Sequence, residues 1–258
     1  MLFRTVYGPE LEAIYQFIAT SNVQGSNPHR PDVYAAFIPR HPDGEFPSTQ
    51  NVDDALAFLK SARLVADDDG FHARMVESNA AFAVKLLRAV RRIETGMEKP
   101  DHPIDPLYIL LLTELFIKPD RLFVRNVHAE ANQLRQVREV GGLTKEKVQA
   151  WKRVMEFLGV GRRFSGGFLC AYMPGLVLAI LEQWTEERGT LQSFFIDHFD
   201  QVLPYAQSNG ELARAVAAPM AYLAERGQIE LFPLQDSPTR PYFGPHRYRG
   251  IARRCSNG

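Results

Sequence analysis

Cysteine is scarce in this sequence, and that scarcity excludes the covalent frameworks of small secreted domains. The only cysteines among 258 residues are Cys170 and Cys255, too few for a disulfide scaffold and without the paired spacing of a zinc site. No apolar run reaches the roughly 18 residues that a membrane-spanning helix needs. Residues 1–4 lack the basic and apolar regions of a signal peptide. We therefore expect a cytoplasmic protein that is not bound to a membrane and holds no metal or cofactor.

Net charge is absent as well, because 30 Lys and Arg residues balance 30 Asp and Glu residues. A neutral chain is not expected to coat DNA along its length, since non-specific affinity comes mainly from cations that neutralise phosphates. The charges are nevertheless uneven. Residues 1–80 carry 6 basic and 11 acidic side chains, residues 81–180 carry 16 and 10, and residues 181–258 carry 8 and 9. The middle of the chain is the basic part.

Catalytic signatures are also missing. The sequence contains no Gly-x-Ser-x-Gly elbow, phosphate-binding Gly-rich loop, dinucleotide fingerprint or His-Glu-x-x-His pair. The nearest groupings are Asp197-His198-x-Asp200 and His128-x-Glu130, and helical pitch turns His198 about 100° away from Asp197. We predict a protein that is not an enzyme. An enzymatic alternative would require metal-dependent turnover that is lost when Asp197 or Glu130 is replaced.

One pattern is present three times: an amphipathic helix, the start of a strand, a turn and a return strand. The three helices are predicted over residues 51–59, 147–158 and 220–226, each with apolar residues at helical spacing. Asp67-Asp68-Asp69-Gly70 predicts a tight hairpin after the first, and Gly166-Gly167 predicts a turn after the second. A helix followed by a two-stranded wing is typical of a binding protein.

The chain divides into three predicted modules, residues 1–96, 97–173 and 174–258. The first ends in a connecting helix over 79–94, and the Pro- and Gly-containing stretch 95–106 is the predicted linker. Residues 10–20 are predicted to form a helix with one apolar face, made by Leu11, Ile14, Tyr15 and Ile18. Residues 25–47 are predicted to be loop around a short apolar piece, with at most one turn of helix. Residues 107–117 are predicted to be a buried helix, and Thr144 the N-cap of the next helix. Helices in the last module are predicted over 174–187, 191–203, 210–216 and 219–226, with a turn at Ala217-Ala218, because proline is disfavoured inside a helix.

The module ends resemble the winged helix-turn-helix superfamily. The resemblance rests on Ala55-Leu56-x-x-Leu59 before Leu64-Val65, with Arg74 after the turn, and on Leu223-x-x-x-Gly227-x-Ile229. It covers roughly two thirds of the chain and indicates no particular family. It implies a mainly α fold with short β-hairpin wings in tandem modules. It also implies DNA binding, in which a helix enters the major groove and a wing reaches the backbone or minor groove.

The middle and C-terminal modules contain the candidate nucleic-acid-binding residues. Cations are expected to contact phosphates, and Gln149 is expected to reach a base edge. The candidates are Lys145, Lys147, Gln149, Lys152 and Arg153 on the helix, Arg162 and Arg163 on the wing, and Arg240, Arg247 and Arg249 near the C-terminus. The alternative interpretation is a solvated basic face.

Other charged residues suggest protein partners. Asp53 and Asp54 lie at the helix end that would approach DNA, where carboxylates repel phosphate, so we expect them to dock a partner or a second copy, or to stabilise the helix N-terminus. Lys85, Arg88 and Arg92 form a stripe that could clamp an acidic partner or simply face solvent. The leading hypothesis is a DNA-binding protein, either a regulator or a subunit of a DNA-processing or defence assembly. The alternative is a non-enzymatic interaction subunit that does not itself read DNA.

Overall fold

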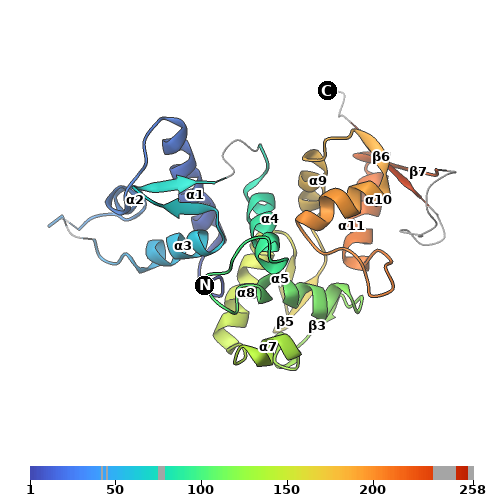
Figure 1. Cartoon of the computed structure of the whole chain (residues 1–258), viewed down its shortest axis with the longest axis horizontal. Coiled ribbons are helices and arrows are strands. Elements are labelled where there is room, and N and C mark those ends of the chain that lie inside the picture. The colour runs from blue at the N-terminus through green and yellow to red at the C-terminus, as the bar shows by residue number, and fades with distance from the viewer. Residues whose placement is uncertain (42, 45, 75–78, 235–247, 255–258) are drawn as a thin grey trace.

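The computed structural model of the chain is elongated, with the N-terminal and C-terminal regions at opposite ends and a helical region between them (Figure 1). It describes residues 1–41, 43–44, 46–74, 79–234 and 248–254. About 49% of the described residues are helical, and the described strands form small antiparallel sheets of two or three strands. The prediction of a mainly helical chain with short β-hairpins is confirmed. Among the described residues, no helix is both long and apolar enough to cross a membrane.

The N-terminal region contains three helices and one hairpin. Its elements are α1 (Gly8–Val23), α2 (Arg30–Phe37), α3 (Gln50–Ser61), β1 (Val65–Asp67) and β2 (Phe71–Ala73). The predicted apolar face of α1 is buried, and β1 pairs with β2 across the predicted turn, with Val65 opposite Ala73. The prediction of loop with at most one helical turn over residues 25–47 is wrong in the length of the helix, because α2 has 8 residues. A carboxylate oxygen of Asp32 accepts from the His29 backbone N–H at 2.8 Å and caps this helix.

The middle region begins with a long helix and ends in a three-stranded sheet. Its elements are α4 (Phe82–Glu94), α5 (Leu107–Leu112), the π-helical turn η1 (Thr113–Ile117), β3 (Phe123–Val124), α6 (Val127–Ala131), α7 (Arg135–Glu139), α8 (Lys145–Phe157), β4 (Gly161–Phe164) and β5 (Gly167–Cys170). The strand order is β3-β5-β4, and both pairings are antiparallel. The Thr144 hydroxyl accepts from the Lys147 backbone N–H at 3.4 Å, which confirms the predicted N-cap. Strand β3 was not predicted.

The C-terminal region repeats this order of elements. It consists of α9 (Pro174–Glu182), β6 (Arg188–Thr190), α10 (Leu191–Ser193), the π-helical turn η2 (Phe194–His198), η3 (Phe199–Gln201), α11 (Arg214–Glu225), β7 (Ile229–Phe232) and β8 (Gly250–Arg253). Its strand order is β6-β8-β7, so in both three-stranded sheets the last strand lies in the centre. From α5 to β5 and from α9 to β8, the chain runs through a helix, a strand, further helices and a final hairpin.

Two helix predictions in the C-terminal region are wrong. The predicted break at Ala217-Ala218 is absent, and α11 runs through Pro219. Proline at this position leaves the carbonyl of Ala215 without its helical donor. The backbone N–H of Tyr172 fills that role at 3.0 Å, so the helix continues. The helix predicted to end near Gly189 stops at Glu182 instead, and Gly189 lies in β6.

The regions share a continuous apolar core. In the middle, Trp151 is fully buried against Phe116 and Phe168, and its indole N–H donates to the Tyr108 carbonyl at 2.8 Å. The end of the predicted linker also belongs to this interior. Asp105 is completely buried and accepts from the backbone N–H of Leu2 at 2.7 Å, which ties the N-terminal segment to the middle region.

Candidate nucleic-acid interface

Helix α8 places most of its predicted contact residues at the surface. Lys145 and Gln149 are exposed, and Lys147 and Arg153 are partly exposed. None of the three cations forms an ion pair with a carboxylate in the part of the chain that the structure describes. A shallow hollow of about 270 Å³ runs along this face and is bordered on its other side by Thr5. The exposed side of α8 therefore offers three cations to an anion, with the carboxylate of Glu146 among them.

The prediction that Lys152 lies on the outside of α8 is wrong. Its side chain is only 3% exposed, and its ammonium group donates to the carbonyl of Gly166 at 3.0 Å. Burial, with a smaller contribution from the nearby Arg163, lowers the pKa of Lys152. Lys152 faces the β4–β5 hairpin, so its aliphatic stem packs against the hairpin and its ammonium group stabilises the turn.

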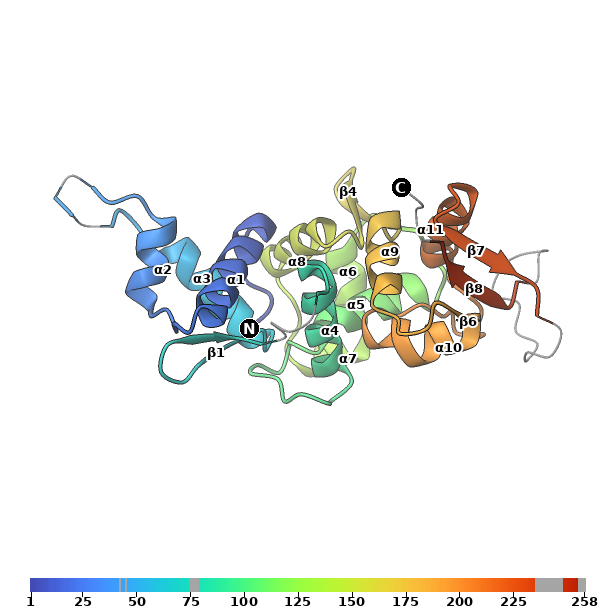
Figure 2. The same ribbon diagram turned by 90° about the horizontal axis from the view of Figure 1, so that it is seen from above.

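The two predicted wing arginines differ in their partners. Arg163 bonds Glu156 twice, through its backbone N–H at 2.9 Å and its Nε at 2.5 Å, so its charge is offset within the protein. Arg162 is exposed, and its closest polar contact is the sulfur of Met173 at 3.7 Å. Figure 2 shows the β4 hairpin projecting beyond the surrounding helices. Arg162 is therefore the wing cation available to a ligand.

The outer face of the β3-β5-β4 sheet contains aromatic side chains that the sequence analysis did not select. Phe164 is 65% exposed at the hairpin and Phe123 is 38% exposed on β3, with ring centroids 6.3 Å apart and an interplanar angle of 78°. Phe123 and Arg162 are both in register with Leu169 of the central strand, so they lie in one row across the sheet. The two rings adjoin each other, and contiguous exposed apolar side chains mark interaction sites more often than single ones do.

The charged residues of this sheet and its flanking segment are all positive. Residues 121–126 and 161–170 contain four arginines and no acidic residue. Arg121 pairs with Glu130 at 2.7 Å and Arg163 pairs with Glu156, whereas Arg125 and Arg162 form no ion pair with a described residue. Both segments contain arginines close to phenylalanines and no acid. This combination is the sequence signal that could have identified the face.

The C-terminal half of α8 is covered by the N-terminal region. A Cβ added at Gly8 would overlap the ring of Phe157, so α1 lies directly against the end of α8. The ring of Phe82 on α4 lies 6.4 Å from the same ring. A groove-entering approach along the whole of α8 is therefore blocked, and only its N-terminal half remains open.

The C-terminal arginines are not gathered at this interface. Arg240 and Arg247 lie outside the described residues. Arg249 is partly exposed, donates to the carbonyl of Leu234 at 3.5 Å, and accepts through its own carbonyl from the N–H of Leu191. Its described contacts therefore lie within the C-terminal region.

The N-terminus of α11, which corresponds in order to α8, is occupied by the middle region. The carboxylate of Asp120 accepts from the backbone N–H of Arg214 at 2.8 Å and from its Nε at 2.7 Å. The Arg214 guanidinium also donates to the Asp120 carbonyl at 2.7 Å. This helix end joins two regions of the chain.

The acids proposed to dock a partner are engaged within the N-terminal region. Asp53 accepts from Arg30 and from the hydroxyl of Tyr34, each at 2.6 Å, and Asp54 accepts from Arg4 at 2.7 Å. Their negative charge is therefore largely offset, and they contribute to holding the helices of this region together. Partner docking at these residues stays a prediction.

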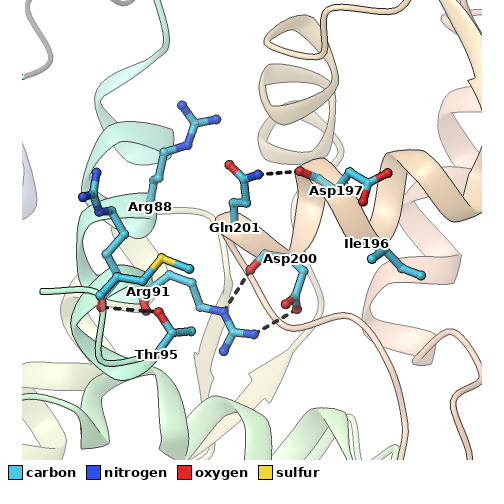
Figure 3. Close-up of a pocket in the computed structure, with 9 residues that line it drawn as sticks. Arg88, Arg91, Thr95, Ile196, Asp197, Asp200 and Gln201 are labelled. Carbon is cyan, nitrogen blue, oxygen red and sulfur yellow. Dashed lines mark hydrogen bonds and ion pairs between the residues drawn. The ribbon is translucent and has the colours of Figure 1, made fainter.

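The stripe on α4 is only partly as expected. Lys85 is 8% exposed, and its ammonium group lies 5.5 Å from the centroid of the Tyr15 ring, so the expectation of a solvent-facing residue is wrong. Arg88 and Arg92 line a cleft of about 590 Å³ between α4 and η2. Figure 3 shows Arg91 reaching across this cleft to Asp200, at 2.9 Å, while Arg88 points away from that pair.

The cleft is not a plain anion site, because carboxylates offset most of the charge of its arginines. Arg91 binds Glu94 and Asp200, Arg92 binds Glu98 at 3.1 Å, and Asp197 adds a further carboxylate to the lining. His198 beside it is bonded through Nε2 to the carbonyl of Ile180 at 2.7 Å.

Within the described ranges, no group of three His, Cys, Asp or Glu residues is arranged to hold a metal ion.

The chain matches no protein-family model, and comparison with curated proteins and with solved structures finds no significant similarity.

Proposed function

We propose that the chain is a DNA-binding protein built from tandem winged-helix modules, acting as a regulator or as a subunit of a DNA-processing or defence assembly. Support for the modules comes from the middle and C-terminal regions, which share the order helix, strand, helices and hairpin. It also comes from the sheets, in which the last strand is central in both. In such a module the third helix and the hairpin wing are the parts that approach DNA.

The observation that carries the proposal is the unpaired positive charge on one side of the middle region. Lys145 and Lys147 on the open half of α8, Arg153 further along the same helix and Arg162 on the hairpin form no ion pair with a described carboxylate. The sheet segments beside Arg162 contain no acid. Cations without internal partners gain most from neutralising phosphates, because binding then releases condensed counterions from the DNA.

A salt titration of duplex binding tests the proposal. The full chain is titrated onto a fluorescent duplex at several salt concentrations, and the logarithm of the binding constant is plotted against the logarithm of the salt concentration. Each phosphate neutralised contributes a slope of about −0.9, so the variant K145A/K147A/R162A should lose roughly two to three units of slope. Arg135→Ala, at an exposed arginine of α7 that pairs with Glu139, is the matched control and should keep the slope. Absence of duplex binding at low salt would refute the proposal.

A second candidate function is an interaction subunit that does not read DNA. The observation that favours it is that α1 packs on the end of α8 and Asp120 holds the start of α11, so two helices that would approach DNA contact this chain instead. Winged-helix modules would then serve as packing units. Recovery of a protein partner from native cells that survives nuclease treatment, together with no salt-dependent duplex binding, would favour this function.

A further inference from the structure

We propose that the outer face of the β3-β5-β4 sheet stacks unpaired DNA bases, so that the middle region prefers DNA in which a single-stranded segment adjoins a duplex. This inference rests on the proposed function and names its substrate class. The face consists of Phe123, Phe164, Arg125 and Arg162, with Leu169 between them on the central strand. We call it the stacking face.

The two rings of the stacking face are presented differently. Phe123 is held in place, because its ring covers Gly167: a Cβ at that glycine would lie 2.7 Å from the ring. Phe164 precedes the turn residues Ser165 and Gly166, both of which have positive φ angles, and its ring projects at the hairpin end with 65% of its surface exposed. Since the rings are nearly perpendicular, a base stacked on one ring would meet the other edge-on.

The charges beside the rings favour a nucleic acid over a protein. Arg162 lies two residues before Phe164 on β4, so this cation and this ring are on the same side of the strand. Arg125 is exposed one residue after the end of β3, close in sequence to Phe123. Neither cation forms an ion pair within the described part of the chain. Phosphates and bases alternate along a single strand, and a surface in which arginines alternate with aromatics pairs with both.

Duplex DNA alone cannot use this surface. Bases inside a duplex are already stacked, so their faces are not available to the two rings. The hairpin contacts α8 through Lys152 and Glu156, and Lys145 lies two helical turns before Lys152 on the same face of the helix. A duplex held by Lys145 and Lys147 would therefore bring a duplex end or a single-stranded overhang toward Phe164. A junction between double and single strands therefore satisfies the helix and the sheet together.

Binding of the full chain to three fluorescent DNAs tests the inference: a blunt duplex, the same duplex with an overhang of about six thymidines, and the single strand alone. The overhang should tighten binding at least about fivefold, the lower limit for stacking on one aromatic side chain. The variant F123A/F164A should lose this gain and retain duplex binding. Phe164→Leu, which keeps apolar bulk without a π-face, should lose most of the gain, and Tyr222→Ala, at an exposed ring of α11, should keep it.

The outcomes separate this inference from the proposed function. Duplex binding without any gain from the overhang, or a gain that survives F123A/F164A, would overturn the stacking face and leave the proposed function standing. Full retention of the gain in Phe164→Leu would also overturn it, because an apolar contact without stacking would then suffice. No binding of any of the three DNAs would refute the proposed function itself. A protein partner captured only when both rings are intact would assign this face to protein docking and overturn base stacking.

Discussion

The middle and C-terminal sheets have the same strand order, but their surface aromatic rings are covered to different extents. In both, a glycine of the central strand lies under an aromatic ring from an outer strand: Phe123 over Gly167 in the middle, and Phe232 over Gly250 in the C-terminal region. The rings differ in what covers them. The guanidinium of Arg188 lies 4.1 Å from the centroid of Phe232, whereas Phe123 and its neighbour Phe164 remain open to solvent.

The charges of the two sheets differ in the same way. In the C-terminal sheet Glu230 pairs with Arg254 at 3.6 Å, so an acid within the sheet offsets a cation. The strands of the middle sheet contain no acid, and Arg162 forms no ion pair with any carboxylate that the structure describes. Helix α8 likewise leaves its N-terminal half open, whereas α11 begins against Asp120. The same order of elements therefore leaves an open surface in the middle region and forms an internal contact in the C-terminal region. The side chains of the two regions cause this difference.

The largest expected effect comes from emptying the core of the middle region. Trp151→Ala removes a fully buried indole that packs on Phe116 and Phe168 and donates to the Tyr108 carbonyl. We expect the free energy of unfolding to fall by about 3–5 kcal/mol, as for other large aromatic truncations. Urea denaturation followed by circular dichroism measures this loss. A loss below about 1 kcal/mol would mean that the middle region does not depend on this cluster.

A smaller effect is expected where α1 closes the end of α8. Gly8→Ala places a methyl group where the Phe157 ring lies, and overpacking of this kind costs about 1–3 kcal/mol. Gly175→Ala is the matched control, since it also lies in the first turn of a helix but meets no atom within 4 Å. Equal unfolding free energies for the two variants in urea would contradict the contact. Tighter duplex binding by Gly8→Ala would show that α1 restricts α8.

The joint at the start of α11 should contribute about 0.5–2 kcal/mol, the usual value of a helix-capping acceptor. Asp120→Ala removes the acceptor for the Arg214 backbone and side chain. It also leaves a residue with a side chain at a φ of 52°, where aspartate is better tolerated than alanine. Asp120→Asn keeps an acceptor and the backbone preference, so it should lose less. Denaturation of both variants at low and high salt tests this order.

The smallest effect is a pH dependence confined to the C-terminal region. Burial lowers the pKa of His198, the bond to the Ile180 carbonyl opposes this shift, and the nearby Arg88 reinforces it. Because the unfolded chain then binds more protons than the folded one, stability is full above the ordinary pKa of 6.5 and falls as the pH drops through the lowered value. His198→Gln should flatten this decline between pH 7 and pH 5 in thermal unfolding, taking the ordinary range of a histidine. An unchanged decline would assign it to other groups.

The sequence predicted the parts of the fold that depend on local patterns. The apolar face of α1, the buried helix over residues 107–117 and the Thr144 cap follow from spacing and from backbone hydrogen bonding within a few residues. The short strands β3 and β6 have no such pattern, because a strand of two or three residues is too short to show alternation. Their position depends on pairing with strands that come much later in the chain.

The candidate site was predicted only in outline. Helical spacing correctly located Lys145 and Gln149 at the surface, but it also put Lys152 there, because spacing does not show that the β4–β5 hairpin folds back over that side of α8. Phe123 and Phe164 were missed for a related reason. Apolar residues are assigned to the core by default, and their exposure depends on the neighbouring strands.

By itself, the sequence determined the helical periods, the caps, the basic character of the middle region and the lack of acid in its sheet segments. The tertiary structure decided which of those charges are paired: Asp53, Asp54, Arg163 and Arg214 form ion pairs, whereas Arg125 and Arg162 form none with a described carboxylate. It also let α11 continue through Pro219 by supplying a donor from Tyr172. The physical reason is range: propensities and caps act within one or two helical turns, whereas burial and ion pairing depend on residues that only folding brings together.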